Sequence, residues 1–286
     1  MKIIHTDEII AAVEKLCMDA NYFLGEDMLQ AFHTAQAAEQ SPLGQNVLGI
    51  LIENADIAKT EQVPMCQDTG MAVIFAELGQ EVQVTGMSLT EALNQGVRQG
   101  YAKGYLRKSI VKDPTLHRDN TGDNTPTVIH YDIVPGDQLK ITVAPKGFGS
   151  ENMGALKMCK PSDGLEGVIN FVVETVDKAG ANPCPPIIVG VGVGGDMEKA
   201  AILAKHSLLR EAGEHNADPE WQKVEAEILR RVNQLGIGPQ GFGGTQTALA
   251  VHIETFPTHI AGMPVAVNIN CHAARHKEVV LTGRDA

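Results

Sequence analysis

The strongest constraint on the fold is the stretch "IIVGVGV" at residues 187–193, an apolar run of strand length without a charged residue. Such a run is typical of a strand that is buried in a sheet. Residues 196–212 and 219–235 then show helical periodicity in succession, where a βαβ unit would place a second strand after the first helix. Helices and strands therefore mix without a regular βαβ rhythm. We predict an α+β fold in which a helical N-terminal part packs with a mixed sheet.

The other periodic segments agree with this mixed architecture. The helix at 89–103 is preceded by a capping box, Ser88 to Glu91, and followed by Gly104. Residues 135–137, Pro-Gly-Asp, separate two strands and indicate a β-hairpin. No linker composition interrupts the chain, so we predict a single domain over residues 1–286. Further helices are expected at 7–20, 26–39, 43–58 and 165–179, and strands at 127–134, 138–145, 247–255 and 263–269.

The composition limits the classes of partner. Hydrophobic residues make up 43% of the 286 residues and charged residues 20%, as in a globular protein. The formal net charge is −12, and an acidic chain without a long basic run is a poor candidate for binding nucleic acid or an anionic membrane. An anionic substrate would need local positive charge from this chain or from a partner.

The sequence also argues against a membrane or secreted protein. No segment reaches the roughly 18 consecutive apolar residues that span a bilayer. The N-terminal stretch "MKIIHTDEIIAAVEKL" carries acidic residues inside its apolar run, unlike a signal peptide, and we expect a cytoplasmic protein. Five cysteines in such a chain indicate buried thiols, metal ligands or a nucleophile rather than disulfides.

Three of the cysteines lie in polar or glycine-rich turns. Cys66 is in "VPMCQDTG", Cys184 precedes the apolar strand in "NPCPP", and Cys271 follows another strand in "NINCHAARH". Cys17, by contrast, lies on the apolar stripe of the first helix and is expected in the core. No C-x-x-C pair is present, so spacing alone leaves open that the three are unrelated thiols. Three thiolates on one iron–sulfur cluster would leave an iron open to substrate oxygens.

Five motifs occur in order over residues 66–276: "CQDTG", "YLRKS", "KGFGSEN", "CPP" before "GVGVGG", and "NINCHAARH". Together they resemble the alpha part of the class I fumarate hydratases and L-tartrate dehydratases, which are iron–sulfur hydro-lyases. The resemblance implies a fold of the iron–sulfur hydro-lyase alpha-subunit (N-terminal catalytic) type. It also implies a 4Fe-4S cluster with one labile iron, and its ligands would be Cys66, Cys184 and Cys271.

The resemblance further implies roles for individual residues. Asp68 matches the proton-transfer aspartate of the family, and Gln67, Arg107 and Gly149 match positions that bind substrate. His259 corresponds to a histidine that lines the pocket in relatives. The residues alone allow other interpretations: an Asx turn for Asp68, a solvated helix-end side chain for Arg107, and an ordinary surface or core residue for His259.

These roles lead us to expect the alpha subunit of an oxygen-sensitive hydro-lyase that reversibly hydrates fumarate to malate. The close alternative is an L-tartrate dehydratase alpha subunit that forms oxaloacetate. The chain ends at Ala286, soon after the third cysteine. The resemblance therefore implies a separate beta subunit that completes the active site, in a symmetric hetero-oligomer.

A different class of function is raised by Gly190–Gly195, "GVGVGG", which fits the dinucleotide-binding pattern G-x-G-x-x-G after a strand. That pattern would indicate an oxidoreductase if a second strand with an acidic end followed the helix. Glu211 and Glu214 are at about the expected distance, but another helix follows them, so the sequence disfavours nucleotide binding. A redox-sensing or scaffold protein whose cysteines bind metal without catalysis is a further alternative.

Overall fold

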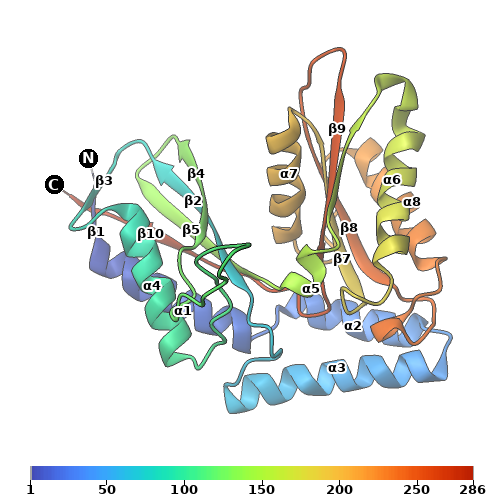
Figure 1. The fold of residues 1–286 in the computed structure, drawn as a ribbon, viewed down its shortest axis with the longest axis horizontal. Coiled ribbons are helices and arrows are strands. Elements are labelled where there is room, and N and C mark those ends of the chain that lie inside the picture. The colour runs from blue at the N-terminus through green and yellow to red at the C-terminus, as the bar shows by residue number, and fades with distance from the viewer. Residues whose placement is uncertain (1, 286) are drawn as a thin grey trace. The chain divides into compact units, whose positions relative to one another are not determined.

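The computed structural model describes residues 2–285, which fall into two units (Figure 1). Unit 1 consists of the chain up to Leu24, Ala55–Gly147 and the chain from Arg275 onward, and unit 2 consists of Gly25–Asn54 and Phe148–Ala274. Each unit is assembled from segments that are distant in the sequence. The α+β class is confirmed, because both units combine helices with a sheet. The single domain over residues 1–286 stays a prediction.

Unit 1 contains two sheets and two main helices. Helices α1 (Thr6–Tyr22) and α4 (Leu89–Lys103) pack against each other. The smaller sheet has the strand order β11-β1-β3, and the larger one has the order β10-β5-β2-β4. The strands are β1 (Lys2–His5), β2 (Met71–Gly79), β3 (Val82–Thr85), β4 (Val128–Val134), β5 (Gln138–Lys146), β10 (Lys277–Thr282) and β11 (Arg284–Asp285).

The predicted N-terminal helices are confirmed. The apolar stripe of α1, including Cys17, is buried in the core of unit 1. Helix α4 begins after Ser88, whose Oγ accepts a hydrogen bond from the amide of Glu91 at 3.2 Å, and it ends at Gly104. Helix α3 (Pro42–Glu61) also forms, with residues in both units. Within residues 2–285, no helix is both long enough and apolar enough to cross a membrane.

The predicted hairpin is wrong. Strands β4 and β5 both form, but β2 lies between them, parallel to β4 and antiparallel to β5. The sequence pattern did not predict β2, whose residues "MAVIFAELG" are mostly buried. Such a strand takes a central position because both of its faces leave water there. Strand β4, with exposed or half-exposed side chains, remains at the edge.

Unit 2 contains one sheet with helices on both faces. The strand order is β6-β9-β7-β8, with β7 parallel to β8 and antiparallel to β9. The predicted strands and helices are confirmed, except that the helix after β7 ends at His206 rather than near residue 212. The strands are β6 (Ala155–Cys159), β7 (Ile187–Gly194), β8 (Ala248–Phe256) and β9 (Met263–Asn270). The helices are α2 (Glu26–Ala38), α5 (Phe148–Glu151), α6 (Gly164–Ala179), α7 (Met197–His206) and α8 (Pro219–Asn233).

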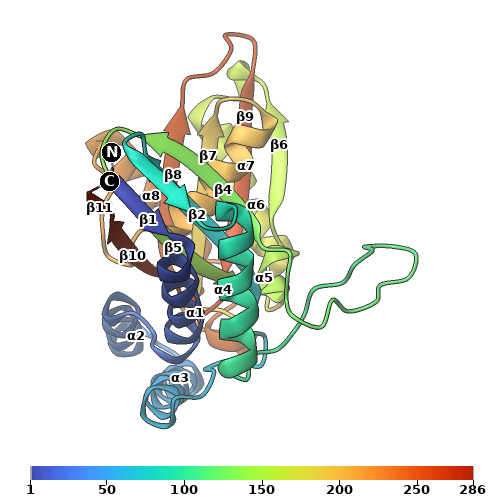
Figure 2. The same ribbon diagram turned by 90° about the vertical axis from the view of Figure 1, so that its left-hand side faces the viewer.

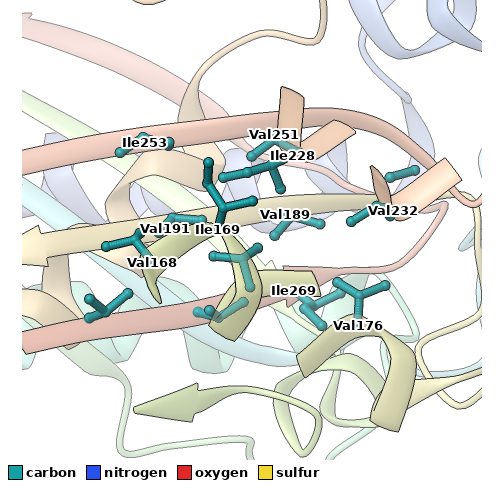
Figure 3. Packing of buried hydrophobic residues seen from close by; sticks show 14 of the residues in the cluster. Val168, Ile169, Val176, Val189, Val191, Ile228, Val232, Val251, Ile253 and Ile269 are labelled. Carbon is teal, nitrogen blue, oxygen red and sulfur yellow. The ribbon is translucent and has the colours of Figure 1, made fainter. Parts of the chain in front are cut away.

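One face of this sheet holds the main core of unit 2. Figure 1 shows α6 and α8 on one side of the sheet and α7 on the other. Val189 and Val191 of β7 pack with Ile169 of α6 and Ile228 of α8 (Figure 3). Because successive side chains of a strand point to opposite faces, the residues of β7 that alternate with these valines face α7.

Those alternate residues are glycines, and they let α7 approach the strand closely. A Cβ at Gly190 would lie 2.2 Å from the carbonyl oxygen of Ala204, and one at Gly192 would lie 2.1 Å from that of Ala200. Any side chain at these two positions would push α7 off the sheet. The glycines of "GVGVGG" within β7 therefore have a packing role.

The connection between α4 and β4 is long and irregular. Residues 104–127 form turns and bends, and Figure 2 shows this loop extending away from the helices and strands of unit 1. The loop returns at Val111 and Asn120, which form an isolated antiparallel bridge. It carries Arg107, so one of the predicted site residues lies on a loop rather than on a regular element.

A buried histidine lies next to the turn that ends α7. His252 on β8 is 1% exposed, and its Nδ1 atom lies 3.2 Å from the carbonyl oxygen of Ser207. Its Nε2 atom is buried without a hydrogen-bond partner among the described residues. Burial, together with the positive charge of Arg210, lowers the pKa of His252 to about 4. The folded protein therefore keeps this imidazole neutral at pH 7.

The stability of the protein should consequently depend on pH. The ordinary pKa of histidine is 6.5, so the unfolded chain binds more protons at this site than the folded chain between pH 6.5 and 4. The free energy of unfolding should fall as the pH falls through this window, with His252 contributing a loss of about 3 kcal/mol. In His252→Gln, the decrease in the free energy of unfolding over this pH window should be smaller by about that amount, as measured by denaturant unfolding. An equal pH dependence in variant and wild type would contradict this assignment.

Candidate active site

The turn Cys66–Gly70, "CQDTG", connects α3 to β2 in unit 1 and is held from its inner side. The hydroxyl of Tyr101 on α4 donates to the carbonyl oxygens of Thr69 at 2.8 Å and of Gly70 at 3.0 Å. Tyr101 is fully buried, and burial raises the pKa of its phenol well above the usual value, so it stays protonated and able to donate. Gly70 has a φ of +78°, and a Cβ there would lie 2.7 Å from the amide nitrogen of Lys146.

Asp68 has a defined orientation in this turn. Its Oδ1 atom accepts a hydrogen bond from the amide of Gly70 at 3.0 Å, so the Asx turn is confirmed. The buried guanidinium of Arg275 donates to the carbonyl oxygen of Asp68 at 2.6 Å. The Oδ2 atom faces Gly147, where an added Cβ would lie 3.5 Å away. The second carboxylate oxygen therefore lies beside Gly147.

The loop after α4 brings Arg107 next to the same turn. The Oγ1 atom of Thr69 accepts from the amide of Arg107 at 2.8 Å and donates to its carbonyl oxygen at 3.3 Å. The side chains of Arg107 and Gln67 are exposed. Cys66 is half-buried, and its Sγ lies 3.5 Å from Oε1 of Gln67. Unit 1 therefore places a thiol, an amide and a carboxylate on one turn, with the backbone of an arginine tied to it.

Two side chains that support this turn, those of Tyr101 and Arg275, were not predicted, and neither was the burial of Lys146. Tyr101 gave no signal beyond its place in an amphipathic helix. Lys146 and Arg275 lie within the quoted motifs "KGFGSEN" and "NINCHAARH", and they are only 4% and 5% exposed. Lys146 donates to the carbonyl oxygen of Gly147 at 3.1 Å. Lysine and arginine are seldom buried without partners, so a cation inside a glycine-rich or apolar motif is the signal that was available.

In unit 2, the turns of Cys184 and Cys271 lie side by side. Strand β7 begins shortly after Cys184 and β9 ends just before Cys271, and the two strands pair through Ile188 and Asn270. The amide of His272 donates to the carbonyl oxygen of Cys184 at 3.1 Å. Cys184 is exposed and has a φ of +54°, a left-handed conformation that non-glycine residues rarely adopt. The sheet thus brings together two of the three predicted cluster ligands.

The other predicted residues of unit 2 lie at two different places. Gly149 is exposed on the short helix α5, and a Cβ there would lie 3.4 Å from the carbonyl oxygen of Asn182, near the Cys184 turn in sequence. His259 is exposed on the loop between β8 and β9. Strand β9 separates His259 from Cys271 by its eight residues, roughly 25 Å. Within this unit, the structure does not bring His259 near the two cysteines.

Accessibility divides the five free cysteines into two groups. Cys17 and Cys159 are buried, and burial raises the pKa of both thiols. Cys66, Cys184 and Cys271 are exposed or half-buried. Accessible thiols in turns suit metal ligation, whereas buried thiols with raised pKa do not. Among residues 2–285, no group of three or more His, Cys, Asp or Glu side chains is arranged as a metal site, so the three-cysteine ligand set stays a prediction.

The structure also bears on the dinucleotide-binding alternative. Strands β7 and β8 are parallel and are connected through α7 and α8, so a parallel partner strand exists although a second helix precedes it. The expected second helix after Glu211 and Glu214 is confirmed as α8, so neither acid stands at the end of the parallel strand. Moreover, Gly190 and Gly192 lie inside β7 and pack against α7, rather than forming a turn around a phosphate. The glycine pattern is thereby accounted for without a nucleotide.

Comparison with known proteins identifies the family. The chain matches the fumarate hydratase (Fumerase) family over residues 10–280 and belongs to it. A relative from Methanocaldococcus jannaschii named "Putative L(+)-tartrate dehydratase subunit alpha" is 42% identical over 272 residues, which cover 94% of this chain and 95% of the relative. The L(+)-tartrate dehydratase subunit alpha of Escherichia coli is 35% identical over 253 residues, 87% of this chain and 83% of the relative. The counterpart from Shigella sonnei is 34% identical over the same extent.

These matches confirm the resemblance drawn from the five motifs. They make the chain a hydro-lyase family member of the alpha-subunit type. The family name refers to fumarate and the names of the relatives refer to L(+)-tartrate, so the comparisons support the class of reaction and leave the two substrates on an equal footing.

Proposed function

We propose that this chain is the alpha subunit of an oxygen-sensitive iron–sulfur hydro-lyase that acts on a four-carbon dicarboxylate. The observation that carries the proposal is the family match over residues 10–280. It is supported by two relatives named as alpha subunits, whose alignments cover 94% and 87% of the chain. The first candidate reaction is the reversible hydration of fumarate to malate. A second candidate is the dehydration of L-tartrate to oxaloacetate, which the names of the relatives support as the family name supports the first.

Asp68 is proposed to transfer the proton. Hydration of fumarate forms a C–O bond from water to one alkene carbon and a C–H bond at the other, and the reverse reaction removes that proton and releases water. A positioned carboxylate can give and take this proton. The hydrogen bond from Gly70 to Oδ1 fixes the orientation of the carboxylate, and we assign the proton transfer to Oδ2.

The substrate carboxylates require hydrogen-bond donors. A guanidinium can bind a carboxylate through two parallel hydrogen bonds, and we assign this role to the exposed side chain of Arg107. Gln67 would contribute its side-chain amide, and Gly149 a main-chain amide unobstructed by a side chain. A role for His259 in lining the pocket stays a prediction that its place on the β8–β9 loop does not support.

Cys66, Cys184 and Cys271 are proposed to hold a 4Fe-4S cluster. Their accessibility fits this role, and the adjacent turns of Cys184 and Cys271 fit it as well. When bound, a cluster with three protein ligands supplies an open iron that acts as a Lewis acid toward the substrate hydroxyl, which is otherwise a poor leaving group.

A beta subunit is the expected partner, because the relatives are named as alpha subunits. We propose that this subunit is a separate chain that completes the active site and adds positive charge for the dicarboxylate. The formal charge of −12 on the alpha chain makes such a contribution useful, since an acidic chain repels an anionic substrate. We further propose that the pair works in the cytoplasm as a symmetric hetero-oligomer.

The function can be tested with the chain co-expressed with the product of the neighbouring open reading frame and purified without oxygen. The pair should contain iron and sulfide and should hydrate fumarate or dehydrate L-tartrate, whereas each subunit alone should be inactive. Activity should fall in air and return with ferrous iron and a thiol. An iron-free pair that turns over neither diacid would overturn the proposal. Full turnover by the isolated chain would refute only the two-subunit arrangement and would leave the proposed reaction in place.

The cluster ligands can be tested by iron content. Serine at Cys66, Cys184 or Cys271 should each remove most of the bound iron, because a neutral hydroxyl is a poor ligand for cluster iron. Cys159→Ala, which alters a buried thiol of β6, is the matched control and should retain iron and sulfide. Circular dichroism checks that each variant is folded. Wild-type iron content in any one of the three serine variants would remove that residue from the ligand set.

The proposed role of Asp68 in proton transfer can be separated from its role in the Asx turn. In Asp68→Asn, the side-chain oxygen can still accept from the Gly70 amide, so the turn should persist while proton transfer is lost. We expect kcat to fall by about 10²- to 10⁴-fold, with unchanged iron content. Asp132→Asn, on the exposed face of β4, is the control and should keep wild-type kcat. A kcat near wild type in Asp68→Asn would exclude the residue as the proton-transfer group.

A further inference from the structure

A glutamine in unit 2 lies beside the two turns that carry Cys184 and Cys271. Gln240 belongs to the segment "GPQGFGG" between α8 and β8, which has no assigned role in the proposed function. Its main-chain amide donates to the carbonyl oxygen of Pro185 at 2.7 Å, and its Nε2 atom donates to the same oxygen at 2.6 Å. Two donors of one residue thus hold the carbonyl group of the residue that directly follows Cys184.

The same side chain reaches the turn of Cys271. The Nε2 atom of Gln240 lies 3.2 Å from Nδ1 of His272. The main-chain amide of His272 donates to the carbonyl oxygen of Cys184 at 3.1 Å, and Nδ1 lies 3.2 Å from that oxygen. A continuous set of hydrogen bonds therefore joins Gln240 to both thiol-bearing turns.

The backbone at these positions is held in an unfavourable conformation. Cys184 has a φ of +54° and Gln240 a φ of +52°. Residues with a Cβ adopt this left-handed region only where surrounding contacts stabilise it, because the Cβ crowds the following carbonyl. The hydrogen bonds at Pro185 and His272 are contacts of this kind, and without them the Cys184 turn would relax.

The segment that carries Gln240 is itself firmly anchored. The amide of Gly243 donates to the carbonyl oxygen of Ile237 at 2.9 Å, which closes the segment. The amides of Thr245 and Gln246 donate to the carboxylate of Glu39, which is 2% exposed, each at 2.9 Å. Burial alone would raise the pKa of Glu39, but these hydrogen bonds outweigh it and lower that pKa, so the carboxylate stays charged. Gln240 is thus presented from a rigid base.

We propose that Gln240 is a positioning residue that fixes the Cys184 and Cys271 turns relative to each other, in the arrangement that receives the metal cluster. This inference rests on the proposed function, because it concerns two of the proposed cluster ligands. A residue that merely fills space would contribute to stability in general. A positioning residue should instead affect the two thiols selectively.

The first test uses the full-length, reduced and iron-free chain. Each cysteine is alkylated with iodoacetamide, and the rates are read by peptide mass spectrometry for wild type, Gln240→Ala and Gln240→Glu. Glutamate keeps the shape of the side chain but replaces the donor that faces Pro185 by an oxygen. Gln30→Ala, on the exposed face of α2, is the matched control.

We expect the half-buried Cys271 to be alkylated about fivefold faster in both Gln240 variants, the effect of losing about one hydrogen bond. Cys66 in unit 1 should change by less than about twofold, and the melting temperature should stay near that of wild type. Unchanged Cys271 reactivity in both variants would overturn the proposal, as would an equal rise at Cys66 and Cys271. Glutamate serves as the decisive variant if alanine disrupts folding.

The second test uses the anaerobic complex with the partner subunit. The Gln240 variants should lose iron in air several-fold faster than wild type, and the electron paramagnetic resonance spectrum of the oxidised cluster should shift. Identical iron loss and spectra would count against a positioning role. Wild-type complex without any iron would instead overturn the proposed function, and the alkylation rates of the iron-free chain would then still decide the role of Gln240.

Discussion

The close contact between β7 and α7 is the constraint on which unit 2 depends. It exists because Gly190 and Gly192 present no side chain to the helix, while Val189 and Val191 fill the opposite face. Burial on both faces makes β7 the centre of its sheet, with the antiparallel β9 on one side and the parallel β8 on the other. The antiparallel pairing in turn brings the start of β7 and the end of β9 together, so the position of two cysteines follows from packing.

The two predicted sites use the same physical device. In each, a buried or anchored polar side chain satisfies the backbone from the inner side of a turn and leaves the chemically active side chains toward solvent. Tyr101 does this at Thr69 and Gly70, and Gln240 does it at Pro185. Because these carbonyl oxygens already accept hydrogen bonds, the backbone of each turn is held in one conformation.

The sequence predicted what local patterns determine. The helix start at Ser88, the stripe of α1 and the apolar run of β7 depend on residues close in the chain, and all three formed as expected. Of the predicted capping box, the bond from the Glu91 amide to Ser88 is present, whereas the Glu91 carboxylate accepts from Arg98. The order of strands in unit 1 depends on which strand exposes the most apolar surface to water when it lies at an edge. This strand is β2, which lies between β4 and β5, and its apolar surface can be compared only with that of segments distant in the sequence. A hairpin inferred from a turn between two strands cannot include a third strand from elsewhere in the chain.

The same distinction applies to the candidate site. Cys66, Gln67 and Asp68 were found because their chemistry is concentrated in five consecutive residues. Tyr101 and Arg275 were not found, because their contacts with this turn span 32 and 207 residues of sequence. Gln240 was overlooked for the same reason, since it contacts Pro185 across 55 residues. Residues that perform chemistry can be recognised by type, whereas residues that orient them can have almost any type and are identified by contact.

The distribution of charge adds a physical reason for the location of the site. The chain is acidic overall, yet within residues 2–285 the buried lysine and arginine side chains are Lys146 and Arg275. Arg275 donates to the backbone of Asp68, and the backbone of Lys146 packs against Gly70. A buried cation acts through a lower dielectric than an exposed one and is screened less by salt. The turn that carries Asp68 thus has a buried positive charge bonded to its backbone, in a chain that is acidic overall.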